Sequence, residues 1–161
     1  MPTFRTPDRT TLYYEEHGAG EPLLLVAGQG SDHHGWDAVL GDFAAHYRCI
    51  TWDHRGTGAS DKPEAPPYSI EGFAADAIAL LDHLGIGSAH AYGVSMGGRI
   101  CQRLAISHAN RMEAVVLGCT TPGNRCGVRR PPEVDTLMAN RPADIDARVA
   151  FQLPLMVSER W

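Results

Sequence analysis

Several features that would place the sequence in a particular class are missing from its 161 residues. No apolar run approaches the length of a membrane span, and the N-terminal MPTFRTPDRT lacks the apolar core of a signal peptide. Positive charge is also scarce: 14 lysines and arginines stand against 19 acidic residues, which leaves a net charge of −5. A nucleic-acid partner would need a basic stripe that neutralises phosphates. The sequence therefore predicts a cytoplasmic protein that binds neither nucleic acid nor membrane.

Motifs for metals, cofactors and disulfides are absent as well. No H-E-x-x-H or comparable metal-ligand spacing occurs, and the glycine-rich segments match neither a phosphate loop nor the G-x-G-x-x-G dinucleotide fingerprint. We therefore expect no metal and no cofactor. The cysteines show no C-x-x-C pairing, and buried free thiols are the simplest interpretation, with a disulfide left open. These cysteines are Cys49, Cys101, Cys119 and Cys126.

The sequence does contain a regular alternation of short apolar runs and amphipathic segments. The clearest helical pattern follows Ser69, which is expected to cap the helix, and stops at Gly85. An order of β-hairpin, β, α, β, α, β, α, β predicts an α/β fold with a mainly parallel sheet and helices on both faces. The predicted strands are 3–6 and 10–17 in the hairpin, then 22–27, 48–52, 89–94 and 112–119, and an earlier helical stripe contains Trp36, Val39, Leu40 and Phe43.

This alternation stops after Cys119. Residues 120–132 are rich in Gly, Pro and Arg and are expected to form a loop, and two modest helices are expected over 133–140 and 143–152, before an apolar tail. We therefore divide the chain into residues 1–121, a core, and 122–161, a separate helical region.

A serine stands at the sharpest predicted turn, where the strand over 89–94 passes directly into a helix. Ser95 lies within Gly93-Val94-Ser95-Met96-Gly97-Gly98, and the G-x-S-x-G spacing is typical of a nucleophile on a strained strand–helix turn. Gly93 and Gly97 supply the missing bulk, and Gly98 is expected to give room where the helix crosses the sheet. By itself the motif also fits a glycine-rich turn with an incidental serine.

Three loops are expected at one edge of the sheet, because each follows the carboxyl end of a parallel strand. They are 28–30, 53–61 and the turn at Ser95. An acyl-transfer site needs a serine, two convergent N–H donors, a histidine base and an orienting acid. The backbone N–H groups of Met96 and Gln29 are the candidate oxyanion donors.

Three motifs occur in these loops: LLLVAGQGSDHHGW (23–36), WDHRGTGASDKP (52–63) and YGVSMGG (92–98). In this order the chain resembles the first part of an α/β-hydrolase of the cofactor-free serine esterase and lactonase type, with enol-lactone hydrolases and anthracycline methylesterases as the nearest relatives. The resemblance implies a hydrolase sheet truncated after its sixth strand and a partial helical cap over 122–161. It also implies a small-molecule carboxylic ester or lactone as substrate and Ser95 as nucleophile.

The chain departs from the family pattern at two places. Ala27-Gly28 stands where the family often has His-Gly, which is tolerable because the donor at Gln29 is a backbone group. The family order is Ser, acid, His, yet 118–121 contains no carboxylate, and the one histidine after Ser95 is His108, roughly 20 Å away along the helix. The triad base and acid are therefore missing from this sequence.

The remaining polar residues of these loops have less specific interpretations. His33 and His34 are expected as polar surface groups flanking a helix, with an approach to the site as the alternative. The resemblance implies a loop-positioning role for His54. Asp53 and Arg55 are expected to brace the loop after their strand, in preference to paired carboxylates or metal ligands.

Two main functions follow from the sequence. The first is a serine hydrolase that is impaired unless complemented, and an acyl-transferring or peroxide-forming relative would use the same serine. The alternative is a non-catalytic truncated hydrolase acting as a binding or oligomeric module. An apolar edge at 112–119 would recruit a partner, so we expect a homo-oligomer or a complementing chain.

Overall fold

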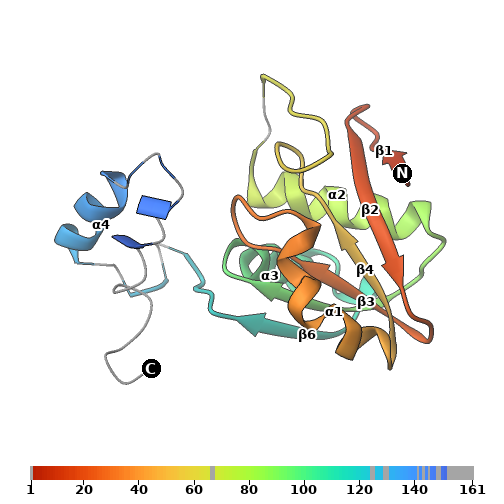
Figure 1. Cartoon of the computed structure of the whole chain (residues 1–161). Helices are drawn as coiled ribbons and strands as arrows, with labels where there is room; N and C mark the ends of the chain where they lie inside the picture. Colours follow the sequence, from red (N-terminus) through yellow and green to blue (C-terminus); the bar gives the residue numbers. More distant parts are fainter. Residues whose placement is uncertain are drawn as a thin grey trace. The chain divides into compact units, whose positions relative to one another are not determined.

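A six-stranded sheet lies at the centre of the first of two units into which the chain divides, Met1–Gly123 and Asn124–Trp161 (Figure 1). The computed structural model describes residues 2–65, 68–123, 126–128, 131–140, 142, 144, 146–147 and 150–151. The strands are β1 (Thr3–Arg5), β2 (Thr11–His17), β3 (Glu21–Val26), β4 (Tyr47–Trp52), β5 (Ala89–Val94) and β6 (Met112–Gly118). The helices are η1 (His33–Trp36), α1 (Asp37–Ala44), α2 (Ile70–His83), α3 (Met96–Ser107), η2 (Ala109–Arg111) and α4 (Pro132–Ala139).

The sheet has the order β1-β2-β4-β3-β5-β6 and is parallel from β4 to β6. Only β2 runs the other way: β1 pairs antiparallel with β2, and β2 antiparallel with β4. In the central register Leu24 lies beside Ile50 on one side and Ala91 on the other. The predicted hairpin and the mainly parallel sheet are confirmed.

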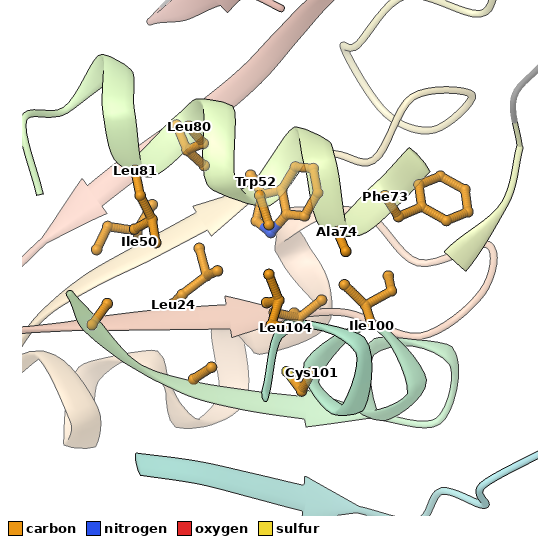
Figure 2. Close-up of a cluster of buried hydrophobic side chains, with 14 of the residues drawn as sticks. Leu24, Ile50, Trp52, Phe73, Ala74, Leu80, Leu81, Ile100, Cys101 and Leu104 are labelled. Carbon is orange, nitrogen blue, oxygen red and sulfur yellow. The ribbon is translucent and has the colours of Figure 1, made fainter. Parts of the chain in front are cut away.

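Helices cover both faces of this sheet. Successive residues of β3 point to opposite faces, so they pack in two different clusters. Leu24 and Val26 pack with α2 and α3 in the larger core, whereas Leu23 and Leu25 pack with Trp36 and the α1 side in a smaller one. Figure 2 shows the larger core, with leucines of α2 facing the sheet and α3. Each fully buried Leu or Ile contributes about 1.5–3 kcal/mol, so these two clusters hold the layers together.

The helix α2 begins and ends as its sequence predicts. Ser69 has an extended backbone, and its hydroxyl oxygen accepts a hydrogen bond from the Gly72 N–H at 3.0 Å. Gly85 follows the helix with a φ of +66°, the left-handed conformation that favours glycine. The stripe on the earlier helix is only partly confirmed, because Val39 is exposed whereas Trp36 is buried.

The apolar edge predicted at 112–119 is confirmed, because β6 lies at the edge of the sheet, where Val116 and Leu117 are 55% and 47% exposed. The expectation that the cysteines are buried is wrong for two of them. All four cysteines are free, but only Cys49 and Cys101 are buried, and burial raises the pKa of the Cys101 thiol to about 12.

In the second unit, the described residues form one full helix, α4, with proline in its first turn. Helical residues also occur at 146–147 and 150–151, within the segment predicted as helix over 143–152. The predicted apolar tail lies outside the described residues. No helix in the described parts of the chain is long and apolar enough to cross a membrane. The assignment of 122–161 as a partial cap stays a prediction.

A buried ion pair joins the loop after β4 to α2. The Arg55 guanidinium donates from Nε and Nη2 to the two Asp76 carboxylate oxygens at 2.7 and 2.5 Å, and from Nη1 to Asp8 at 2.8 Å. The side chains of Arg55 and Asp76 are almost fully buried. The predicted bracing role of Arg55 is therefore confirmed, and its partners come from two distant segments.

We expect Asp76→Asn to lower the free energy of unfolding by about 3 kcal/mol, because it leaves the buried Arg55 charge without its main partner. Glu71→Gln is the matched control on the same helix, since it removes an exposed pair with Arg103 and should cost about 1 kcal/mol or less. Urea unfolding of both variants measures the difference. Equal losses in the two variants would contradict this account.

Candidate active site

Ser95 occupies the turn between β5 and α3 with a φ of +56° and a ψ of −115°. Few residues other than glycine adopt a positive φ, and such strain concentrates at functional sites. The Ser95 N–H donates to the Gly118 carbonyl at 3.0 Å, and the Ser95 carbonyl accepts from the Thr120 hydroxyl at 2.7 Å. The strained strand–turn–helix conformation predicted from the motif is confirmed, and the Ser95 side chain is exposed at its tip.

Glycines around Ser95 let the start of α3 approach the sheet closely. A Cβ atom on Gly97 would lie 2.0 Å from the Val26 carbonyl oxygen of β3, and one on Gly93 would lie 2.3 Å from the Gly97 oxygen. Gly98 has a different neighbour from the one expected: its added Cβ would meet the Thr120 side chain at 2.6 Å. The room at Gly98 is therefore filled by the loop after β6, which also holds the Ser95 carbonyl.

The loop after β3 lies directly beside Ser95. A Cβ on Gly28 would be 3.5 Å from the Ser95 Cβ and 4.0 Å from its Oγ. Within the described residues, the backbone N–H of Gln29 has no hydrogen-bond partner. Met96 is the first residue of α3, so its N–H has no intrahelical acceptor. The structure thus brings the Gly28 loop next to Ser95 and leaves both candidate donors unpaired.

The buried Asp53 carboxylate accepts hydrogen bonds from both the loop after β3 and the loop after β4. Its Oδ1 accepts from the His33 N–H at 2.8 Å and from His33 Nδ1 at 2.7 Å. Its Oδ2 accepts from the Ala59 N–H at 2.7 Å. The predicted bracing role of Asp53 is confirmed, although Asp61 does not share the site, because its carboxylate binds the Thr11 N–H.

The expectation that His33 and His34 are both polar surface groups is wrong for His33. Its side chain is only 12% exposed, packs against the Tyr13 ring at 4.8 Å and lies 3.8 Å from Glu15. His34 is 66% exposed and binds Asp37 at 3.0 Å. Nothing in the local sequence distinguishes the two histidines. Because a carboxylate only accepts hydrogen bonds, the His33 Nδ1–H is the donor to Asp53 Oδ1.

His54 is fully buried beneath the same loop. Its Nε2 donates to the Ala27 carbonyl at 3.1 Å, and its ring lies 4.5 Å from that of Trp52. Among the described residues its Nδ1 has no partner. Burial lowers the pKa of His54 below its usual value, so the imidazole is neutral. The loop contact agrees with the role that the resemblance implied.

No base for Ser95 is present among the described residues. The Ser95 Oγ makes no hydrogen bond there, His33 and His54 bind other groups, and His108 caps the far end of α3. The described residues also contain no group of three or more His, Cys, Asp or Glu side chains arranged to hold a metal ion. Among the described residues, the geometry therefore offers an exposed serine and two unpaired N–H groups, with no proton acceptor bonded to the serine hydroxyl.

The alpha/beta hydrolase fold model matches residues 21–149, which is most of the chain. The chain belongs to the α/β-hydrolase family. Among curated proteins, RutD of Azorhizobium caulinodans, named provisionally as a carbamate hydrolase, is 39% identical over 106 residues, or 66% of this chain and 40% of RutD. The chain thus spans less than half the length of such curated relatives.

Solved structures of other α/β-hydrolases show the same arrangement. The enol-lactonase from Burkholderia xenovorans LB400 is 30% identical with a TM-score of 0.76, over 95% of this chain and 58% of that one. Est816, described as an enzyme that degrades N-acyl homoserine lactones, is 29% identical with a TM-score of 0.74, over 86% of this chain and 52% of that one.

His54 should make the stability of this α/β-hydrolase chain depend on pH. Its pKa is lowered from 6.5 in the folded state, so below about pH 6.5 the unfolded chain binds the proton and the folded protein does not. The free energy of unfolding therefore decreases as the pH is lowered, by up to about 1.4 kcal/mol per pH unit from this group. His54→Asn keeps a donor for Ala27 and should remove that part of the slope in urea unfolding between about pH 7.5 and about pH 5. An unchanged slope would contradict the assignment.

Proposed function

We propose that this chain carries the nucleophile and the oxyanion hole of a serine hydrolase acting on small-molecule carboxylic esters or lactones. The observation that carries the proposal is the strained turn at Ser95 with Gly28 beside it. The two free N–H groups of Gln29 and Met96 serve as the oxyanion donors. The enol-lactonase and the lactone-degrading Est816 support the substrate class.

In the proposed reaction the Ser95 Oγ attacks the carbonyl carbon, and the carbonyl π electrons move onto the oxygen. The Gln29 and Met96 N–H groups stabilise that oxyanion, which collapses to an acyl-enzyme as the C–O bond to the leaving alkoxide breaks. A base takes the Ser95 proton and passes it to the alkoxide, and water then hydrolyses the acyl-enzyme. The reaction needs no cofactor.

The base and its orienting acid come from outside these 161 residues, either from further sequence of the same protein or from a second chain. Without them, only the residual catalysis of binding and the oxyanion hole is expected. The assignment of residues 122–161 to a partial helical cap stays a prediction, as does a cytoplasmic location. The proposed site therefore supplies the nucleophile and the oxyanion donors. It is fully active only when another segment or chain supplies the base and the acid.

The chain should react slowly with a fluorophosphonate probe at Ser95, because the oxyanion donors can hold the phosphoryl oxygen while the Oγ–P bond forms, fluoride leaves and solvent takes the Ser95 proton. Ser95→Ala should abolish the labelling, whereas Ser107→Ala, which removes an exposed serine at the end of α3, should leave it unchanged. Intact-protein mass spectrometry measures the adduct. An unlabelled chain at high probe concentration would rule out a live nucleophile in this chain.

The edge strand β6 favours a second candidate, a binding or oligomeric module. Among the described strands β6 pairs only with β5, so its outer edge leaves backbone N–H and C=O groups open beside the exposed Val116 and Leu117. Open apolar edges recruit further strands. We propose that a second copy of the chain, or a complementing chain, covers this edge.

Sedimentation at micromolar concentration should therefore give a species larger than the monomer. Leu117→Glu should shift it toward the monomer, because a charge on the edge opposes strand pairing. Ile106→Glu is the control: it places the same charge on an exposed apolar residue of α3 in place of one on β6, and should leave the assembly intact. A wild-type monomer would overturn this second proposal.

A further inference from the structure

The loop that carries Gln29 is held at both of its ends by consecutive side chains of another loop. It starts at Ala27, where β3 has ended, and runs to His33, where η1 begins. Asp53 and His54 lie side by side directly after β4. Because β3 and β4 are parallel neighbours, their carboxyl ends bring these two loops together.

His54 holds the first end. Its Nε2–H donates to the Ala27 carbonyl at 3.1 Å, and its ring lies between Trp52 at 4.5 Å and Phe73 at 5.3 Å. A fully buried imidazole with an unpaired Nδ1 costs stability. The one hydrogen bond that it makes in the described part of the chain is the one to the Gln29 loop.

Asp53 holds the second end. One of its oxygens accepts both the backbone N–H and the Nδ1–H of His33, and the other accepts the Ala59 N–H. The carboxylate has no exposed surface, and charge-assisted bonds of this kind are the strong ones. Gly58 lies so close that a Cβ atom added to it would be 2.0 Å from Asp53 Oδ2. The loop after β4 is thus folded closely around this one carboxylate.

Between these anchors the loop has little support of its own. Its one internal backbone bond is the Ser31 N–H to the Gly28 carbonyl at 3.2 Å, and Gly30 has a φ of +78°. Gln29 and Gly30 are exposed. The direction of the Gln29 N–H is therefore set by the positions of Ala27 and His33.

We propose that Asp53 and His54 are positioning residues for the Gln29 oxyanion donor, with His33 as the link through which Asp53 acts. The inference rests on the proposed function, because it assigns Gln29 the same role. Oxyanion donors contribute only at a defined distance from the developing charge, and removal of one such donor costs about 100- to 1000-fold in rate. Partial misplacement should cost less, about tenfold.

The test compares His33→Ala with His33→Asn. Alanine removes the side-chain donor to Asp53, whereas asparagine keeps an N–H at nearly the same position. We expect the maximal rate of fluorophosphonate labelling at Ser95 to fall about tenfold in His33→Ala with little change in the half-saturating probe concentration, and to recover in His33→Asn. Asp53→Asn should resemble His33→Ala.

Amide hydrogen exchange at Ser31, followed by NMR, gives a second measurement that does not need a reactive serine. Ser31 bonds to neither substituted residue, so faster exchange in His33→Ala reports a loosened loop. We expect exchange about tenfold faster than in the wild type for His33→Ala, and wild-type exchange for His33→Asn.

Leu81→Ala is the control variant for this test. It removes a fully buried side chain from the core side of α2 and no hydrogen bond of either loop. It should lower stability and leave both the labelling rate and the Ser31 exchange unchanged in the folded protein.

The possible outcomes separate the two proposals. Unlabelled wild-type protein with faster Ser31 exchange in His33→Ala would overturn the proposed function and leave the anchoring intact. Equal labelling and equal exchange in His33→Ala and wild type would overturn the positioning role. Failure of His33→Asn to restore either measurement would do the same.

Discussion

The close approach of α3 to the sheet is the constraint on which the rest of the structure depends. Gly97 lies against the carbonyl oxygens of Val26 and Ala27, where any side chain would collide with backbone. This contact fixes the start of α3 over the ends of β3 and β5, and the serine that joins β5 to α3 is left with a φ of +56°. A methyl group at Gly97 would separate the helix, the serine and the Gly28 loop together.

The loops around Ser95 are held from three directions by groups that have no part in the chemistry. Thr120 binds the Ser95 carbonyl from the loop after β6, His54 binds the Ala27 carbonyl, and Asp53 binds His33. Behind them, Arg55 ties the loop after β4 to α2. Preorganisation of this kind is what an oxyanion site requires, since its donors must stand in place before charge develops.

Among the described residues, the outer edge of β6 is unpaired and Ser95 has no base. The chain spans 40% of the RutD relative and 58% of the enol-lactonase chain, and the edge strand is the last one described. A proton acceptor for Ser95 and a cover for Val116 and Leu117 would both have to come from groups outside the described residues. Ser95 and its neighbouring loops nevertheless lie on a sheet that has a packed core on each face.

The sequence by itself determined the strand–helix order, the α2 cap at Ser69 and the strained turn at Ser95, because these depend on local periodicity and on glycine spacing. Only the tertiary structure decided that His33 is largely covered whereas His34 is exposed, and that Thr120 fills the room at Gly98. Those outcomes depend on contacts between segments far apart in the chain, such as the one between His33 and Asp53, which are 20 positions apart. Neither periodicity nor composition records which distant residue will stand opposite a given side chain.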